Sequence, residues 1–310
     1  MPKTFLIYNP QSGRRRALRR QQVEIAAGIL LRGGMEVTMS PTSGPGSAGE
    51  QARNAITQGH DTIIACGGDG TVHEVLQGIA GSRATLGLIP LGTGNALAYD
   101  LGIPRDPAAA AHALLRARIC HIHLGETEYS QGTQTASPYF LTVCGAGADA
   151  EMLYKLAFQF KTRFGMFAYY AVGARLWLTH RFVPFRAEFT DLESGTRRSE
   201  TVTQILAVRV TRFGELLREL AHGASLERQD FQLVLFKTSS RLRYLRQIAG
   251  MMSARHWPVR DIETVRTNDV LCTPLENSRR VYVEADGELL GKLPARLRMS
   301  REKLSLLKPL

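Results

Sequence analysis

The sequence predicts two domains: an α/β N-terminal domain built on a parallel sheet, and a C-terminal domain that is a mainly antiparallel β-sandwich. In the first part, buried apolar strands alternate with amphipathic helices, which is the pattern of a doubly wound sheet. After about residue 122, short strand-like segments follow one another with turn residues between them, as in a sandwich. We therefore expect domains over residues 1–122 and 123–310, with the extreme C-terminus packing back on the first domain.

Composition narrows the class of protein and of partner. The 310 residues are 44% hydrophobic and 22% charged, which is typical of a soluble globular protein. The net charge of +11 favours an anionic partner, such as a phosphorylated nucleotide, nucleic acid or an acidic membrane surface. Four widely spaced cysteines without zinc spacing indicate a reducing compartment. Since no signal peptide or span of about 20 apolar residues is present, we expect a cytoplasmic protein.

The chain is organised around one strand, turn and helix. The apolar segment Ile63 to Cys66 has the length of a buried parallel strand, and apolar residues then recur at helical spacing from Val72. Between them, Gly67-Gly68-Asp69-Gly70 places three glycines around one carboxylate, at the start of a helix that favours an anion. An acid within an anion-binding turn needs a counter-cation, and magnesium-bound phosphate supplies both charges.

The other elements of the first domain alternate in the same way. Phe5 to Tyr8 predicts a strand that ends in the loop Asn9 to Gly13, and five arginines then open a helix. Of these arginines, Arg14 is the favoured phosphate contact, and the outer ones are equally compatible with a solvated helix face. The further expected elements are strands over Met35 to Met39 and Leu86 to Pro90, helices over Ser47 to Ile56 and from Asp106 or Pro107 to about Arg116, and a glycine loop over Leu91 to Asn95.

The second half contains the strands of the expected sandwich. They are Ile119 to Leu124, Tyr139 to Cys144, Arg186 to Thr190, Thr201 to Val210, Phe231 to Phe236, Val281 to Ala285 and Ala295 to Met299. Two helices interrupt them, one from about Ala150 to Leu178 and one from Leu242 to Ala254.

Several common sites are disfavoured. The chain has no Gly-x-x-x-x-Gly-Lys-Ser/Thr segment, so it is not a P-loop protein. Gly145 to Ala150 fits the loose dinucleotide pattern, but no acid that could bind a ribose lies from Met152 to Ala187. His121 and His123 lack a third nearby ligand and are interpreted as packed or solvated. No nucleic-acid motif or aromatic stacking platform accompanies the basic residues.

Four motifs in order resemble the diacylglycerol kinase catalytic domain family, in its bacterial lipid kinase and sphingosine kinase branches. They are Asn9-Pro10-Gln11-Ser12-Gly13, Gly67-Gly68-Asp69-Gly70-Thr71 with Glu74, Pro90-Leu91-Gly92-Thr93-Gly94-Asn95, and Asp286-Gly287-Glu288. The resemblance covers nearly the whole chain and implies the fold shared by NAD kinases and diacylglycerol kinases. It implies an ATP- and Mg²⁺-dependent kinase that phosphorylates a hydroxyl of a diacylglycerol- or sphingoid-like lipid.

The family likeness also assigns residues. It implies that ATP is bound by Asn9, Ser12, Gly13, Thr42, Gly67, Gly68, Asp69, Gly70, Thr71, Val72, His73, Gly92, Thr93 and Asn95. Asp69 would face the magnesium ion and the transferring phosphate, and Glu288 matches the proton acceptor for the lipid hydroxyl, so both are expected to be catalytic. The chemistry agrees, because phosphoryl transfer to an alcohol needs positioning, charge neutralisation and a carboxylate near the hydroxyl. Taken locally, Asp286-Gly287-Glu288 is better explained as a hairpin turn, and only its occurrence with the other three motifs favours the functional interpretation.

One departure from the family concerns a metal. Relatives with a structural magnesium site usually carry Asp-Gly just before the strand matching Phe231 to Phe236, and here Arg228 takes the place of that aspartate. The arginine replaces the charge of the cation, or Glu227 or Asp230 shifts to bind it, so the metal ligands are unknown. Ala96 also stands where many relatives carry an acid, which would loosen a helix cap.

The segment from Met152 to Ala187 suggests a membrane contact. It contains six basic residues and several aromatic ones, and no acid. Such a helix suits an anionic bilayer, although packing on the sandwich is the ordinary alternative. We therefore expect peripheral membrane association, with Lys161 and Arg163 at the surface. A homodimer, which is common among relatives, is an analogy only.

Two other functions compete with the lipid kinase. An NAD kinase-like phosphotransferase shares the Gly-Gly-Asp-Gly-Thr turn, but is disfavoured by the Pro90 to Asn95 loop, by the Asp286-Gly287-Glu288 placement and by the aromatic basic segment. A non-catalytic nucleotide- or lipid-binding regulator would be favoured by loss of Asp69 or Glu288, and both are present.

Overall fold

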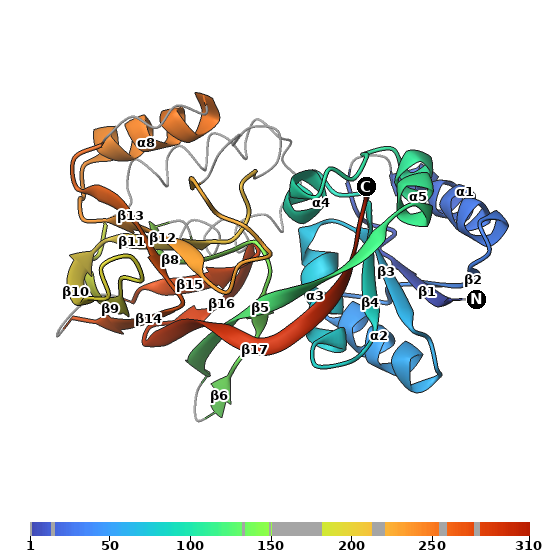
Figure 1. The fold of residues 1–310 in the computed structure, drawn as a ribbon, viewed down its shortest axis with the longest axis horizontal. Coiled ribbons are helices and arrows are strands. Elements are labelled where there is room, and N and C mark those ends of the chain that lie inside the picture. The colour runs from blue at the N-terminus through green and yellow to red at the C-terminus, as the bar shows by residue number, and fades with distance from the viewer. Residues whose placement is uncertain are drawn as a thin grey trace. The chain divides into compact units, whose positions relative to one another are not determined.

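The computed structural model describes residues 2–13, 16–131, 134–148, 150, 182–212, 221–253, 259–275 and 280–310 (Figure 1). The chain divides into two compact units. Unit 1 comprises Met1–Leu124, Arg212–Leu216 and Ser300–Leu310, and unit 2 comprises Gly125–Thr211 and Leu217–Met299. In the part of the chain that the structure describes, no helix has the length and apolar content needed to span a membrane.

Unit 1 is built on four parallel strands in the order β2-β1-β3-β4. Their bounds are Lys3–Tyr8 (β1), Glu36–Pro41 (β2), Thr62–Gly67 (β3) and Thr85–Pro90 (β4). The end of β17 (Ala295–Lys308) continues the sheet, because Ser305 and Leu306 pair in parallel with Thr85 and Leu86. Every residue of β3 and β4 is buried, as expected for strands covered on both faces.

Helices cover both faces of this sheet. Their bounds are Arg19–Arg32 (α1, preceded by a 3₁₀ turn at Arg16–Leu18), Ser47–Thr57 (α2), Asp69–Ile79 (α3), Ala96–Asp100 (α4) and Pro107–Leu115 (α5). Within unit 1, α1 packs beside α5 on one face, and α2 packs beside α3 on the other (Figure 1). Gly49 of α2 and Gly78 of α3 allow these helices to pack closely. A Cβ on Gly49 would lie 2.7 Å from the carbonyl oxygen of Glu74, and a Cβ on Gly78 would collide with the carbonyl oxygen of Gly49.

Unit 2 contains a six-stranded antiparallel sheet in the order β13-β12-β11-β8-β15-β16. The strands are Val143–Gly147 (β8), Gln204–Val208 (β11), Phe231–Phe236 (β12), Ile262–Thr267 (β13), Tyr282–Ala285 (β15) and Glu288–Lys292 (β16). A second antiparallel layer contains Phe185–Thr190 (β9), Arg197–Val202 (β10), Asp269–Pro274 (β14) and the first half of β17, together with part of Arg118–Gln131 (β5), Gln134–Ala136 (β6) and Tyr139–Phe140 (β7). Helix α8 spans Arg241–Ser253.

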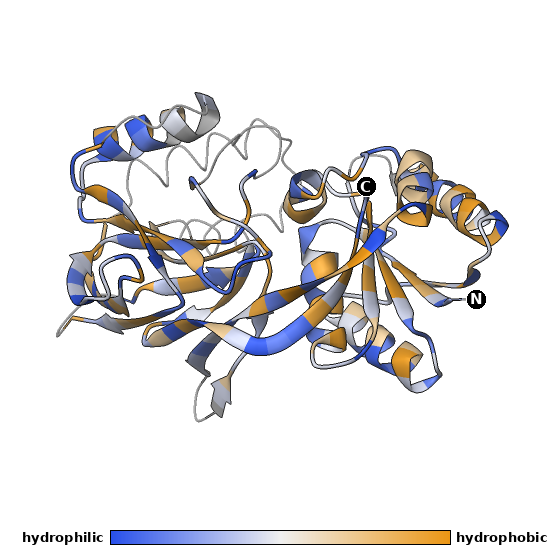
Figure 2. Ribbon diagram, viewed as in Figure 1, coloured by the Kyte–Doolittle hydropathy of each residue, from blue (hydrophilic) through white to orange (hydrophobic). Residues whose placement is uncertain are grey.

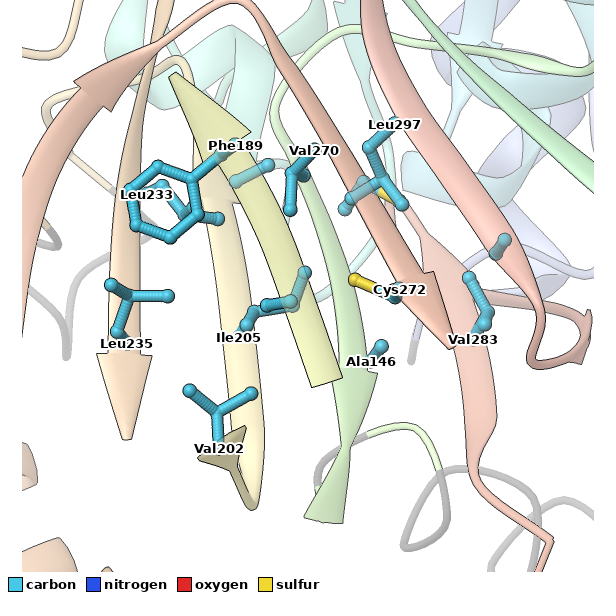
Figure 3. Packing of buried hydrophobic residues seen from close by; sticks show 14 of the residues in the cluster. Ala146, Phe189, Val202, Ile205, Leu233, Leu235, Val270, Cys272, Val283 and Leu297 are labelled. Carbon is cyan, nitrogen blue, oxygen red and sulfur yellow. The ribbon is translucent and has the colours of Figure 1, made fainter. Parts of the chain in front are cut away.

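The two layers of unit 2 enclose one apolar core (Figure 3). Leu233, Leu235 and Ile205 project from the six-stranded sheet, and Phe189 and Val270 project from the facing layer. Strand β9 alternates inward apolar residues with outward polar ones, whereas β8 and β12 are buried at every position. Two antiparallel layers that enclose one core form a β-sandwich. The fold class predicted from the sequence is therefore confirmed.

The structure changes some element bounds. The expected strand from Thr201 to Val210 divides at Thr203, which bonds to Phe236 O through both its backbone N and its Oγ1. The sequence pattern did not indicate strands β13 and β14. In β13, for example, charged and apolar residues are mixed at half-exposed positions, so no regular alternation is visible. The expected helix from Ala150 to Leu178 lies almost entirely outside the described residues.

Candidate functional site

Four loops of unit 1 leave the same edge of the sheet, because β1, β2, β3 and β4 are parallel. Backbone bonds connect them to neighbouring strands: Asn9 N donates to Cys66 O (3.0 Å), Thr42 N to Tyr8 O (2.8 Å), and Leu91 N to Gly67 O (2.8 Å). The carboxyl edge of such a sheet is where open α/β folds bind ligands. The structure thus brings the loops containing Asn9, Thr42, Gly68 and Thr93 to one edge.

Glycines let these loops approach more closely than side chains would allow. A Cβ on Gly92 would lie 2.5 Å from the Cα of Gly68, and one on Gly94 would lie 2.8 Å from Asp69 Oδ2. Gly13 has φ +66°, and a Cβ there would collide with the carbonyl oxygen of Leu91. Because no side chain intervenes, the backbones of three loops can approach a ligand at this edge.

Asp69 ties the two glycine loops together. Its Oδ2 accepts a hydrogen bond from Asn95 N (2.8 Å), and its Oδ1 accepts one from Ala96 N (2.7 Å). Asp69 is also the first residue of α3 and is half-buried. We expected Ala96 to leave the start of α4 without an acidic cap. The Asp69 carboxylate, at the start of α3, instead accepts the hydrogen bonds at the start of α4.

The remaining motif residues shape the loops. Asn95 adopts φ 53° and exchanges two side-chain bonds with Gly92, through Oδ1 to the N–H (3.0 Å) and through Nδ2 to the carbonyl (2.9 Å). Thr71 and His73 are buried in the first turns of α3, with Thr71 packed against Gly67. Backbone groups at the start of α3, where the helix itself provides no partner for the first N–H groups, are therefore the natural ligand contacts.

Two residues support this edge and were not identified from the sequence in that role. Glu74 accepts bonds from Gly46 N (2.8 Å) and Ala48 N (3.1 Å), which fixes the loop before α2. Arg19 is buried and donates from Nε to Ser12 O (2.7 Å), so it holds the Ser12-Gly13 loop. The arginine cluster in the sequence was the only signal for Arg19, and Arg14, the favoured phosphate contact, lies outside the described residues.

Unit 2 contains the fourth motif, in the hairpin between β15 and β16. Asp286 (φ 51°) and Gly287 (φ 86°) occupy the left-handed region, as a type I′ turn requires. The Asp286 carboxylate is buried and accepts bonds from the backbone N–H groups of Leu141 (2.9 Å), Thr142 (2.7 Å) and Val143 (3.3 Å). Glu288, directly after the turn, is exposed. The turn thus has a rigid base and presents an exposed carboxylate.

The family resemblance implies two magnesium sites, and the residues present suit a magnesium ion at only one of them. In unit 1, Asp69 adjoins the helix start, and a carboxylate has about four acceptor positions, so two amide bonds are compatible with a cation beside it. In unit 2, both oxygens of Asp230 are bonded by Arg228 (2.8 Å each), and Oδ2 also by Arg266 (2.9 Å). Among the described residues, no cluster of three metal-ligating side chains occurs. The residues before β12 therefore do not fit the structural magnesium of relatives.

The two histidines of β5 were expected to be packed or solvated, and in the structure His121 is exposed and His123 is half-buried. His121 Nδ1 lies 3.1 Å from Ser305 Oγ, and His123 Nδ1 lies 3.3 Å from Ser300 O. Both therefore contact the final strand of the chain.

Comparison with known proteins gives matches across both parts of the chain. A model of the diacylglycerol kinase catalytic domain matches residues 3–127, and a model of the YegS C-terminal NAD kinase beta sandwich-like domain matches residues 142–308. Diacylglycerol kinase from Bacillus subtilis strain 168 is 29% identical over 297 residues, which cover 95% of this chain and 92% of that protein. The diacylglycerol kinase of Staphylococcus saprophyticus is 25% identical over 307 residues, covering 98% and 94%.

A solved structure shares the fold. A crystal structure of a diacylglycerol kinase from Bacillus anthracis str. Sterne has a TM-score of 0.70 at 18% identity, covering 99% of this chain and 96% of that chain. At this identity, the likeness concerns the fold, and it agrees with the α/β unit and the β-sandwich described above.

Proposed function

We propose that this chain, which belongs to the diacylglycerol kinase catalytic domain family, transfers the γ-phosphate of magnesium-bound ATP to a hydroxyl of a diacylglycerol- or sphingoid-like lipid. The family resemblance predicted from the motifs is confirmed, and with it the class of enzyme, a lipid kinase whose acceptor is an alcohol group. The proposal adds the phosphate donor, the metal and the kind of lipid.

One observation carries the choice of ATP: three glycine or serine loops meet at one sheet edge, around the start of α3 and the Asp69 carboxylate. The helix start favours an anion, and the missing side chains let backbone N–H groups approach phosphate oxygens. A magnesium ion at Asp69 would neutralise charge on the transferring phosphate. Asn9, Ser12, Gly13, Thr42, Gly67 to His73, Gly92, Thr93 and Asn95 are proposed to form this site.

Glu288 is proposed as the proton acceptor. In the reaction, the lipid hydroxyl oxygen forms a bond to the γ-phosphorus, the bond from that phosphorus to the β–γ bridging oxygen breaks, and ADP leaves with the bonding electrons. The hydroxyl proton passes to the Glu288 carboxylate. Such general-base assistance is typically worth 10²- to 10⁴-fold.

The test separates chemistry from binding. The assay measures labelled γ-phosphate transfer to diacylglycerol in mixed micelles, with wild type, Glu288→Gln and the matched variant Glu302→Gln. Glu302 is an exposed carboxylate in unit 1, outside the proposed site. We expect Glu288→Gln to lower kcat by at least about 100-fold with little change in ATP affinity, and Glu302→Gln to be unaffected. Equal kcat in all three proteins would contradict the assignment of Glu288.

Peripheral membrane association is also proposed, and helix α8 supports it. Residues 238–260 contain five arginines and no acid. Leu242 and Leu245 of α8 are 76% and 48% exposed, on the same side of the helix as Arg246. Hydrophilic and hydrophobic residues alternate over the first turns of α8 (Figure 2). Exposed leucines between arginines suit an anionic bilayer, where each basic residue contributes on the order of 1 kcal/mol. The segment Met152 to Ala187, expected to dock, lies almost entirely outside the described residues.

Vesicle sedimentation tests this surface. Leu242→Ser with Leu245→Ser should lower partitioning onto phosphatidylglycerol vesicles by about 10- to 100-fold, because two leucine side chains no longer enter the interface. Leu31→Ser in α1, where Leu31 is 52% exposed, is the matched control and should bind as wild type does. If the α8 double variant binds as wild type, the docking surface lies elsewhere.

A further inference from the structure

Four strand ends meet at one edge of the six-stranded sheet in unit 2. Because β8 is antiparallel to both β11 and β15, the ends of those two strands flank the start of β8. Arg209 directly follows β11, and Asp286 directly follows β15. Since β12 is antiparallel to β11, Asp230, just before β12, lies at the same edge. The topology thus places one arginine between two carboxylates.

Asp286 bonds to all three residues of the segment 141–143, and Arg209 bonds to Leu141 and Thr142 of the same segment. Asp286 accepts hydrogen bonds from all three backbone N–H groups, and its own N–H donates to Val143 O (2.8 Å). Arg209 N donates to Thr142 O (2.8 Å), and Arg209 Nη1 donates to Leu141 O (3.5 Å). The base of the Asp286-Gly287-Glu288 turn therefore depends on both residues.

The Arg209 side chain is fully buried, at 0% exposure, and Nη2 donates to Leu226 O (3.2 Å). Burial lowers the pKa of its guanidinium to about 10, while the charges of Asp286 and Asp230 oppose that shift. The group is therefore a cation at neutral pH. A buried charge is costly unless a specific arrangement compensates it. Here the guanidinium donates to two carbonyl groups, and the charges of Asp286 and Asp230 favour the cation.

We propose that Arg209 is a positioning residue: its guanidinium supplies, from within the chain, the buried positive charge that fixes Asp286 and thereby the direction of Glu288. The residues before β12 do not fit a metal ion, and a cationic side chain at this edge makes one unnecessary. The inference rests on the proposed function, since it is Glu288 that Arg209 positions. It extends that function by naming a residue that acts through Asp286 without touching the substrate.

The experiment compares Arg209→Met, Arg209→Lys and Asp286→Asn by hydrogen exchange and by kinetics. In Arg209→Met, we expect the amides of residues 141–143 to exchange at least about 10-fold faster and kcat to fall about 100-fold, with the KM for ATP unchanged. Arg209→Lys, which keeps the charge, should recover part of both. Arg198→Met, the control, removes a guanidinium bonded to Glu200 and Glu263 elsewhere in unit 2 and should change neither.

Non-additivity distinguishes positioning from general loss of stability. If Arg209 acts through Asp286, the double variant Arg209→Met with Asp286→Asn should lose no more kcat than the worse single variant. Wild type without nucleotide should melt at the same temperature in magnesium and in EDTA. Additive kcat losses, unchanged exchange at residues 141–143 or EDTA-sensitive melting would overturn the proposal.

Failure of the proposed function is recognised separately. A wild type that phosphorylates no lipid refutes that function, while the exchange rates of residues 141–143 still decide whether Arg209 orders this segment. If Arg209→Met does not fold, Arg209→Gln, which keeps donors and lacks the charge, replaces it. Slower exchange in Arg209→Lys than in Arg209→Gln would then support the role of the charge, and equal exchange would refute it.

Discussion

The carboxylate of Asp69 should be structural as well as functional, and the cost of removing it follows from its contacts. In Asp69→Ala, the N–H groups of Asn95 and Ala96 lose a charged acceptor at 2.8 and 2.7 Å. A hydrogen bond to a charged group contributes about 1.5–3 kcal/mol, and the lower end applies because Asp69 is only half-buried. Two such bonds give an expected loss of about 3 kcal/mol in the opening free energy of the loop before α4.

Hydrogen exchange measured by mass spectrometry on peptides that cover residues 91–100 reports this loss locally. Asp106→Ala is the matched control, because Asp106 caps α5 with a single bond to Ala109 N (2.9 Å) and should cost about 1 kcal/mol at its own helix. The reasoning would be refuted if Asp69→Ala left exchange in residues 91–100 unchanged. Because Asp69→Ala also loosens this loop, loss of activity in that variant does not by itself prove a role of Asp69 in phosphoryl transfer.

Three further predictions follow from the described contacts. Gly92→Ala should weaken binding of a fluorescent ATP analogue by at least about 10-fold, because its Cβ would lie 2.5 Å from the Cα of a neighbouring loop, whereas Gly28→Ala within α1 should leave binding unchanged. The Arg198 guanidinium holds the pKa of Glu263 at about 2, below its ordinary value of 4.5. The contribution of this ion pair to the free energy of unfolding is therefore present above pH 4.5 and lost as the pH falls towards 2. Because the Glu263 side chain is 37% exposed, this contribution is at most about 1 kcal/mol. Urea unfolding at several pH values should show that Glu263→Gln lacks this part of the loss of stability in acid. Burial raises the pKa of the Cys66 thiol, so alkylation should modify Cys66 in the urea-unfolded protein and spare it in the folded one, as peptide mapping will show.

The sequence predicted the arrangement of the loops in unit 1 because local patterns determine it. Buried strands such as Ile63 to Cys66 indicated a parallel sheet, and parallel strands necessarily send their following loops to one edge. The glycines after Cys66 indicated an anion-binding turn, but the close approach of Gly68 to Gly92 was not predicted and is seen only in the structure. The hairpin at Asp286-Gly287 was likewise predicted from its dipeptide.

Contacts between distant segments could not be predicted. Glu74 bonds to Gly46 and Ala48, 28 and 26 residues away, and nothing in the local pattern of α3 indicates these partners. Arg209 ends an apolar segment, where an arginine usually marks solvent, yet it is fully buried. Its place between two carboxylates depends on the order of four strands, and that order is not encoded by any one of them.

The central claim is that ATP is the donor and a lipid hydroxyl the acceptor, and one reaction tests it most directly. Wild type is incubated with γ-labelled ATP, magnesium, diacylglycerol, a sphingoid base and NAD together, and the labelled products are separated. The account predicts label in one lipid product, none in NAD, and loss of that product in Glu288→Gln. Label in NAD alone would identify an NAD kinase-like enzyme, and label in no acceptor, with ATP still bound, would indicate a non-catalytic regulator; either result would contradict the account.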